Sequence, residues 1–260
     1  MKDLFSVKDK VALVTGGGQG IGLMIAQGLV EAGAKTYISS RKTDVIEKEA
    51  AALSKSGTCI AIQADLSTEE GCLALAEEIG KREEQLHIVV NNAGNNWGAP
   101  FEEYPDAAFD RCYALNVKGV FHLTRALVPM LSKAASDDDP ARVINIGSID
   151  GIQAPFLETY AYSATKAAVL HMTRVLARKL APQRITVNAI APGPFESKMM
   201  HETLEAFGDQ IKSTIPLGRI GRPEDMAGAT IYLASRAGAY LTGLTIRVDG
   251  GSTTSRSRAA

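Results

Sequence analysis

The sequence predicts an α/β protein built on a doubly wound parallel sheet. Three observations support this fold class: short apolar runs recur along the chain, helical patterns separate them, and a glycine-rich turn follows the first run. Strict alternation of strand and helix is typical of parallel sheets with helices on both faces. No composition break or internal repeat divides the chain, so residues 1–260 are expected to form a single domain.

Seven apolar, β-branched runs are the predicted strands. Each is nearly continuous, as expected of a strand that helices cover on both faces. In chain order the runs are residues 11–15, 36–39, 59–64, 88–91, 142–146, 186–190 and 244–248.

Helices are predicted in the intervals between these strands. The first should end at Gly33, because glycine suits the left-handed residue that follows a helix. The second should have Thr43 as its N-cap, and the last should have Pro223 in its first turn. The predicted ranges are 20–33, 44–56, 68–81, 106–135, 159–180 and 223–235.

Two segments interrupt this alternation and are predicted as loops. Residues 95–106 contain two prolines and the only tryptophan of the chain. Residues 192–217 lie between a strand and the last helix, at the sheet edge where open α/β folds hold ligands, and are a candidate lid. Residues 252–260 are small and polar, and we expect a loose tail there.

Composition and charge exclude several functional classes. The 28 Lys and Arg residues balance 29 Asp and Glu residues, so no net positive charge is available to attract nucleic acid or an anionic membrane. No apolar run reaches the length of a spanning helix, and the N-terminal segment lacks the apolar core of a secretory signal. The 3 dispersed cysteines and 4 histidines show no metal-ligand spacing, which predicts reduced thiols, no metal site and a cytoplasmic protein.

A glycine-rich turn follows the first predicted strand and opens the first predicted helix. It reads Thr15-Gly16-Gly17-Gly18-Gln19-Gly20-Ile21-Gly22. Without side chains the backbone can turn tightly and approach a pyrophosphate, whose charge meets unpaired N–H groups at the helix N-terminus. The order of strand, turn and helix favours a dinucleotide site over a purely structural turn.

The second predicted strand ends in Ser39-Ser40-Arg41-Lys42, where no acidic residue is present. In dinucleotide-binding folds a carboxylate near this point binds a ribose 2′-hydroxyl, whereas an arginine accommodates a 2′-phosphate. A guanidinium can hold that phosphate in a charge-assisted pair, and a carboxylate would repel it. The segment therefore favours NADPH over NADH; the alternative is that these basic residues are only solvated at a strand exit.

Tyr162 and Lys166 lie four residues apart in a predicted helix, so both side chains project from one face. The pKa of a free tyrosine is near 10, and a neighbouring cation stabilises the phenolate and lowers that pKa. A hydroxyl that donates its proton while a carbonyl is reduced acts as a general acid. Such a pair is common on helix surfaces, and its surroundings decide the interpretation.

Other polar residues occupy positions suited to the same site. Ser148 follows the fifth predicted strand, where its hydroxyl can hold a substrate carbonyl oxygen. Asn116 lies inside a predicted helix, although asparagine is a poor helix former. The segment Asn91-Asn92-Ala93-Gly94 ends another strand with small and polar residues that allow close approach of a cofactor.

Taken in order, these motifs resemble the short-chain dehydrogenase/reductase family from about Lys10 to Gly251. The residues that carry the resemblance are TGGGQGIG at 15–22, Asp65-Leu66, NNAG at 91–94, Asn116, Ser148, YSATK at 162–166 and Pro192-Gly193. The resemblance implies a seven-stranded Rossmann fold. Within the family the chain is most similar to 3-oxoacyl reductases, especially those of the rhamnolipid-pathway type.

The resemblance also implies the roles of four residues. Tyr162 is the expected acid/base, and Ser148 orients the carbonyl. Lys166 is expected to bind the nicotinamide ribose and to lower the pKa of Tyr162, while Asn116 positions a water in a proton relay. Tyr160 is an alternative acid, although no lysine follows it four residues later.

The resemblance further implies which residues contact the cofactor. Asp65 and Leu66 are assigned to the adenine, Asn92 to the adenosine, and the Pro192-Gly193 pair to the nicotinamide. The full expected set is Gly16, Gly18, Gln19, Gly20, Ile21, Gly22, Ser40, Arg41, Lys42, Asp65, Leu66, Asn92, Ala93, Gly94, Tyr162, Lys166, Pro192 and Gly193.

Two positions depart from the usual pattern of the family. Ser148 and Tyr162 are one residue further apart than is commonest, so we expect a bulge in the segment between them. Gln19 stands where NADPH-preferring members often have a basic residue, which leaves the two basic residues after the second strand as the main source of selectivity.

The chain is therefore predicted to be an NADPH-dependent reductase that transfers a hydride to a ketone, of 3-oxoacyl or other type, giving a secondary alcohol. An NAD-dependent alcohol dehydrogenase and a nucleotide sensor without catalysis are the alternatives. The expected partners are a small ketone or alcohol and further copies of the chain, as a homotetramer or homodimer. The acidic residues at 137–139 predict repulsion of an acidic carrier protein, which favours free or small-thioester substrates.

Overall fold

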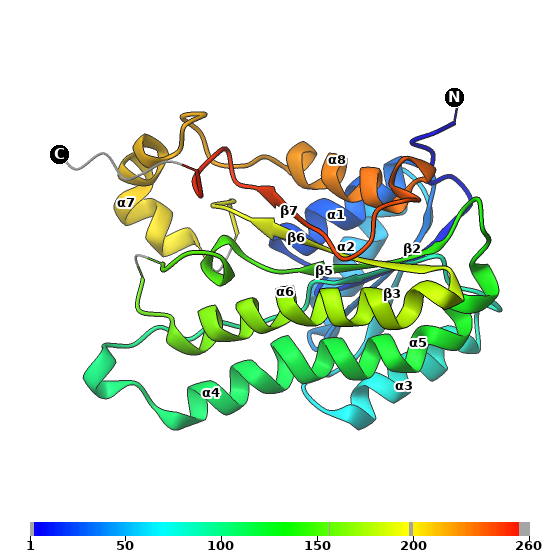
Figure 1. The fold of residues 1–260 in the computed structure, drawn as a ribbon, viewed down its shortest axis with the longest axis horizontal. Coiled ribbons are helices and arrows are strands. Elements are labelled where there is room, and N and C mark those ends of the chain that lie inside the picture. The colour runs from blue at the N-terminus through cyan, green and yellow to red at the C-terminus, as the bar shows by residue number, and fades with distance from the viewer. Residues whose placement is uncertain (1–2, 156, 198–199, 255–260) are drawn as a thin grey trace.

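A seven-stranded parallel sheet forms the centre of the protein in the computed structural model, which describes residues 3–155, 157–197 and 200–254, without the side chains of residues 201 and 202. Neighbouring strands run parallel in the order β3-β2-β1-β4-β5-β6-β7 (Figure 1). The predicted Rossmann fold is therefore confirmed. The strands are β1 Val11–Thr15, β2 Lys35–Ser40, β3 Cys59–Gln63, β4 Ile88–Asn91, β5 Ala141–Ile146, β6 Ile185–Pro192 and β7 Thr245–Val248.

Helices cover both faces of this sheet (Figure 1). Residues of α1, α2 and α8 pack in one apolar cluster, and residues of α3, α5 and α6 pack in a second cluster on the opposite face. Within the described part of the chain, no helix is both long enough and apolar enough to cross a membrane. The helices are α1 Gly20–Glu31, α2 Thr43–Leu53, α3 Glu69–Gly80, α4 Asp106–Tyr113, α5 Val120–Ala134, α6 Tyr160–Leu180, α7 His201–Thr214 and α8 Pro223–Ala234.

The strand order reverses between β1 and β4, and this reversal positions the site. The chain passes outward from β1 to β3 on one side and from β4 to β7 on the other. Connections that leave β1 and β4 therefore diverge, which opens a crevice at the carboxyl ends of these strands. The glycine-rich turn, the Asn91–Gly94 segment and Ser148 all follow strands that end at this edge.

Several helix boundaries differ from the sequence prediction. Gly33 has a φ of 87° just past α1, as predicted, and Pro223 is the first residue of α8. Thr43 is the first residue of α2 rather than its cap, because Lys42 occupies the N-cap position with extended backbone. The helix predicted over residues 106–135 is present, but a π-helical turn over Ala114–Gly119 interrupts it between α4 and α5.

The segment predicted as a loop over residues 192–217 contains a helix that the sequence analysis missed. Helix α7 has a kink at Phe207, whose φ and ψ of −132° and 15° are not helical, and Gly208 follows directly. None of its described side chains is fully buried. Its apolar residues nevertheless gather on one face, which is a helical pattern that the sequence analysis did not use. Whether this segment acts as a lid stays a prediction, and Met199 lies outside the described residues.

The predicted tail is also shorter than expected. Asp249 accepts hydrogen bonds from the backbone and hydroxyl groups of Thr253, at 2.9 and 2.6 Å. Arg247 donates to the same hydroxyl at 3.0 Å. Residues 252–254 are thus attached to the end of β7, and residues 255–260 lie outside the described part of the chain.

A buried ion cluster joins the opposite edge of the sheet to the end of α8. Arg142, with 1% of its surface exposed, donates to the carbonyl oxygens of Leu233 and Ser235 and to Asp139 at 3.0 Å. Lys10 makes a second ion pair with Asp139 at 2.7 Å. Burial lowers the pKa of both cations, and the carboxylate of Asp139 opposes that shift.

These contacts correct the prediction that residues 137–139 repel a carrier protein. Asp137 is paired with Arg184, and Asp139 neutralises two cations, so the run is not a free acidic patch. The run also precedes β5, at the amino ends of the strands, whereas the candidate site is at the carboxyl ends. The argument against an acidic partner therefore cannot rest on these residues.

We expect Asp139→Asn to lower the free energy of unfolding by about 3 kcal/mol, because it leaves two buried cations without their counter-charge. Asp138→Asn is the matched control, because this substitution removes an equal charge from the adjacent position, where the side chain of Asp138 is exposed. Chemical denaturation of both variants provides the comparison. Equal unfolding midpoints for the two variants would show that the cluster contributes nothing.

Candidate active site

The glycine-rich turn between β1 and α1 has no room for side chains at two positions. Gly16 has a φ of 65°, a left-handed conformation that glycine adopts without strain. A Cβ at Gly22 would lie 2.3 Å from the carbonyl oxygen of Gly16. Gln19 caps α1 without a side-chain hydrogen bond, and no acidic residue lies in the first turn, so the positive end of the helix is open to an anion. The turn therefore has the shape that a pyrophosphate requires.

Asn92 holds this turn in place from the neighbouring strand. Its side-chain amide donates to the carbonyl oxygens of Thr15, at 2.9 Å, and Gly16, at 3.3 Å. The hydroxyl of Thr15 in turn accepts from the backbone N–H groups of Asn92 and Ala93, each at 2.9 Å. The amide of Asn92 is thus engaged with the protein, which makes this residue a support of the phosphate turn as well as a predicted cofactor contact.

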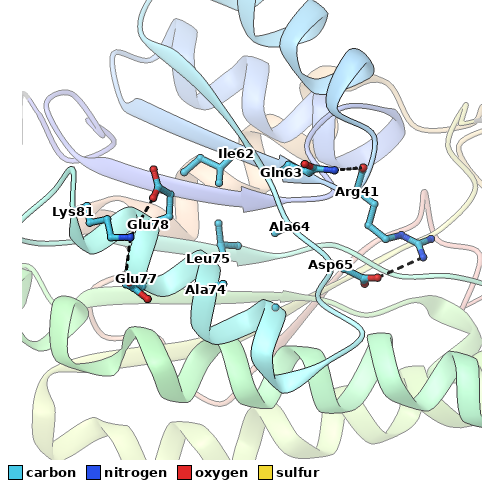
Figure 2. Close-up of a pocket in the computed structure, with 11 residues that line it drawn as sticks. Arg41, Ile62, Gln63, Ala64, Asp65, Ala74, Leu75, Glu77, Glu78 and Lys81 are labelled. Carbon is cyan, nitrogen blue, oxygen red and sulfur yellow. Dashed lines mark hydrogen bonds and ion pairs between the residues drawn. The ribbon is translucent and has the colours of Figure 1, made fainter.

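Arg41 and Asp65 face each other at the outer end of the crevice. Their charged groups are 4.0 Å apart, and the two side chains are 60% and 48% exposed (Figure 2). A surface cavity of about 600 Å³ extends from them between β3 and α3. Burial favours a higher pKa for Asp65, but hydrogen bonds from Ser67 and the charge of Arg41 outweigh it and lower the pKa. A guanidinium this exposed is free to bind another anion.

The remaining predicted cofactor residues lie at the same edge of the sheet. Lys42 is exposed beside Arg41, and its backbone N–H donates to the hydroxyl of Ser40. The side chain of Leu66 is buried in the core, so only its backbone is available to a ligand. The backbone N–H of Gly193 donates to Val248, which fixes the chain as it leaves β6.

Lys166 is buried and tied to the end of β5. Its ammonium donates to the carbonyl oxygen of Ile146 at 2.7 Å and lies 5.5 Å from the ring centre of Tyr162. A Cβ at Gly94 would lie 3.6 Å from the Lys166 nitrogen, an ordinary contact distance, so the loop after β4 lies directly beside the ammonium. The structure therefore brings the Tyr162–Lys166 pair to the loop that follows β4.

Ser148 lies at the start of the short turn that follows β5. Its hydroxyl oxygen accepts the backbone N–H of Asp150 at 3.1 Å. A hydrogen bond between the hydroxyls of Ser148 and Tyr162 brings these two groups together. The segment predicted to bulge contains a single 3₁₀ turn, Ile149–Gly151, before irregular chain leads to α6. Phe156 in this segment lies outside the described residues.

The pKa of Tyr162 is opposite to the sequence prediction. Burial raises it to about 12, a hydrogen bond with Ser148 opposes the rise, and Asp150 and Cys112 add to it. Lys166 is not among the causes of this shift, and its ammonium lies over the ring and donates to the carbonyl oxygen of Ile146. The lowering by Lys166 that the resemblance implies stays a prediction. Burial lowers the pKa of Lys166 itself to about 8, against the charges of Asp150 and Cys112.

Asn116 lies in the π-helical turn and connects three elements. Its amide nitrogen donates to the carbonyl oxygen of Asn95 and to the hydroxyl of Thr165, both at 3.0 Å. Its amide oxygen accepts the backbone N–H of Asn95 at 2.9 Å. The π-helical widening is common at functional sites, and here it joins the loop after β4 to α6. The predicted relay through a water stays a prediction.

The structure adds residues that the sequence analysis did not select. Asn95 and Thr165 hold Asn116, and Asp150 acts on the charges of the tyrosine and the lysine. These residues are recognised only by contacts between segments that are distant in the sequence, so no local motif could have identified them. Among the described residues, no cluster of three or more His, Cys, Asp and Glu side chains has the geometry to hold a metal ion.

Comparison with known proteins gives a consistent result. The family model described as enoyl-(acyl carrier protein) reductase matches residues 16–253. The rhamnolipids biosynthesis 3-oxoacyl-[acyl-carrier-protein] reductase of Pseudomonas aeruginosa is 47% identical over 257 residues, which cover 96% of this chain and 99% of that protein. An NAD-dependent glycerol dehydrogenase of Listeria innocua is 33% identical over 96% of each chain.

A solved structure of high similarity comes from the same Pseudomonas species. It is described as the RhlG/NADP active-site complex and is 46% identical to this chain. The two structures superpose with a TM-score of 0.94 over 97% of this chain and 99% of that one.

Tyr162→Phe tests which hydroxyl is the acid. The change retains the ring but removes the proton donor, so we expect ketone reduction to fall by at least about 100-fold while cofactor affinity persists. Tyr160→Phe is the control, because the hydroxyl of Tyr160 is exposed and donates to Glu158 at 2.8 Å. Initial rates and cofactor fluorescence titrations give both quantities. Full activity in Tyr162→Phe together with loss in Tyr160→Phe would reverse the assignment.

Proposed function

The chain belongs to the short-chain dehydrogenase/reductase family. From this premise we propose that it is an NADPH-dependent reductase of 3-oxoacyl substrates, which it takes as free ketones or as small thioesters. The observation that carries the proposal is the packing of the Lys166 ammonium, which donates to Ile146 at the end of β5 and lies 5.5 Å from the ring centre of Tyr162. Burial raises the pKa of Tyr162, so its hydroxyl keeps its proton at neutral pH, as a donor in ketone reduction must. The name of the relative at 47% identity supports the 3-oxoacyl class.

Three side chains share the chemical step. The hydroxyl of Ser148, whose oxygen accepts from Asp150, donates to the substrate carbonyl and holds it beside Tyr162. Tyr162 then transfers its proton to the carbonyl oxygen as negative charge develops there. Lys166, buried within 5.5 Å of the ring, offsets the phenolate that this transfer leaves. Ser148 and Lys166 are buried and Tyr162 is half-buried, so these electrostatic effects are stronger than in bulk water.

The residues of the crevice suit a dinucleotide. The glycine turn and the open N-terminus of α1 would hold the pyrophosphate, and Arg41 with Lys42 would hold a 2′-phosphate. The side of the crevice near Gly94, Pro192 and Lys166 would take the nicotinamide ribose and ring. When bound, NADPH supplies the hydride that the ketone accepts.

Cofactor choice should depend on Arg41. Arg41→Asp replaces the phosphate-binding cation by a repelling carboxylate, so we expect NADPH affinity to fall by about tenfold or more while NADH affinity changes little. Lys42→Ala, at the adjacent exposed position, should have a smaller effect. Turnover with NADPH, NADH, NADP⁺ and NAD⁺ measures the preference. Unchanged NADPH affinity in Arg41→Asp would refute the assignment and favour the NAD-dependent alternative.

Charges near the start of α6 support the proposal for the form of the substrate. The side chains of Glu102, Glu103, Asp106 and Glu158 are exposed, and the first three follow the exposed Phe101 within five residues. The backbone N–H of Phe101 donates to the Glu158 carboxylate, so these segments are adjacent. An acidic rim next to the helix that carries Tyr162 would repel an acidic carrier protein. This rim replaces residues 137–139 as the reason to propose small substrates.

A substrate comparison tests this proposal directly. We expect kcat/KM for a 3-oxoacyl group on a short neutral thiol to lie within about tenfold of the value on an acyl carrier protein. Coenzyme A and cyclic ketones complete the panel, each measured with NADPH. A carrier advantage well above tenfold that disappears in high salt would overturn the proposal for small substrates. Absence of any ketone reduction would refute the reductase function itself.

We also propose that the protein assembles as a homotetramer. Large apolar side chains on the outer surfaces of α4, α5 and α6 are exposed, among them Phe109, Tyr113, Phe121 and Val175. Such a surface is typical of an interaction site. Light scattering should give a mass near four times the 27.6 kDa of the chain; a mass of one chain would contradict the assembly.

A further inference from the structure

The first turn of α6, which contains Tyr162, is not capped by a side chain of its own. Thr159 occupies the N-cap position, but within the described structure its side chain makes no capping hydrogen bond. Its hydroxyl donates instead to the carbonyl oxygen of Leu157 at 3.4 Å. The first N–H groups of a helix have no partner inside that helix. Those of α6 therefore need an acceptor from another part of the chain.

The acceptor comes from the loop between β4 and α4. The backbone N–H of Ala161 donates to the hydroxyl oxygen of Tyr104 at 3.1 Å, and the same hydroxyl donates to the carbonyl oxygen of Trp97 at 3.0 Å. The phenol thus uses a lone pair on the helix and its proton on the loop. One side chain joins the two segments.

Further contacts hold this loop against the segment that leads into α6. The backbone N–H groups of Ala99 and Phe101 donate to the backbone carbonyl and to the carboxylate of Glu158, each at 3.3 Å. The ring of Tyr104 packs edge-on against the ring of Tyr160, with the two centres 5.1 Å apart. Packing therefore holds the ring, so that its hydroxyl is presented to the helix in one orientation.

Tyr162 lies between two contacts that come from outside α6. After it in the chain, the hydroxyl of Thr165 donates to the carbonyl oxygen of Tyr162 at 2.8 Å and accepts from the amide of Asn116 at 3.0 Å. Before it, Ala161 is the adjacent residue, and its N–H is held by Tyr104. Asn116 belongs to the predicted catalytic set, whereas Tyr104 does not.

We propose that Tyr104 is a positioning residue, whose hydroxyl caps the first turn of α6 and holds Tyr162 where a substrate carbonyl can receive its proton. This inference rests on the proposed role of Tyr162 as the acid. Proton transfer requires hydrogen-bond distance between the acid and the carbonyl oxygen, and a misplacement of about 1 Å can cost about 100-fold in rate. Loss of the cap should therefore lower kcat. Cofactor affinity should persist, because the glycine turn and Arg41 lie on other elements.

Amide hydrogen exchange, followed by NMR, tests the cap without any substrate. Tyr104→Phe retains the ring and removes only the hydroxyl, so we expect the Ala161 amide to exchange about tenfold faster relative to amides in the last turns of α6. Tyr160→Phe is the matched control. It removes a phenol hydroxyl that donates to Glu158, from a ring in contact with Tyr104, and should leave the Ala161 amide at its parent rate. An unchanged Ala161 rate in Tyr104→Phe overturns the proposal.

Steady-state kinetics of NADPH-dependent ketone reduction tests the positioning role. In Tyr104→Phe we expect kcat to fall by about tenfold or more, with KM for the ketone and the dissociation constant of NADPH within about twofold of the parent values. The unfolding midpoint is measured on the same sample.

Two kinetic results would overturn the proposal. A higher KM at the parent kcat would mean that the loop only shapes the substrate pocket. Parent kinetics with a lower unfolding midpoint would mean that the hydroxyl of Tyr104 only stabilises the fold. If the parent protein reduces no ketone, the proposed function fails, and the exchange rate of the Ala161 amide still decides whether Tyr104 caps the helix.

Discussion

The hydrogen bond from the buried ammonium of Lys166 to the carbonyl oxygen of Ile146 is the interaction on which the site depends. A buried charge is costly unless it is hydrogen-bonded and compensated. Here the last residue of β5 supplies the acceptor at 2.7 Å, which fixes the position of α6 against the carboxyl end of the sheet. Tyr162 is positioned by the same helix one turn earlier. Gly151 leaves the space that this arrangement needs, since a Cβ there would lie 2.6 Å from the carbonyl carbon of Lys166.

The parallel sheet explains why distant segments can meet around this one ammonium. Strands β1, β4, β5 and β6 end at one edge of the sheet, so the loops that follow these four strands all start at that edge. Polar groups then link the connections: Asn92 ties the loop after β4 to the phosphate turn, and Asn116 ties it to α6. Both asparagines use their amides on the protein. Much of the polar chemistry near the site therefore serves to hold backbone segments in register rather than to contact a ligand.

The sequence predicted the fold, and the segments that it selected for the site lie at one edge of the sheet, because both depend on local patterns. Apolar runs located every strand, and the strand–turn–helix order located the phosphate turn. Features that arise from tertiary contacts were not predictable. The carboxylates at 137 and 139 find partners more than forty residues away, and burial raises the pKa of Tyr162 where the sequence predicted a lower one.

The two ends of the crevice use charge in different ways. Arg41 is 60% exposed and only 4.0 Å from Asp65, so solvent screens the pair and little energy holds the guanidinium in one place. Lys166 is buried at the other end, where water screens charges less. Under the proposed function, cofactor selectivity and proton transfer would therefore depend on separate sets of charges. A change at the exposed end would then alter which nucleotide binds without altering the chemistry, whereas a change at the buried end would act on every substrate.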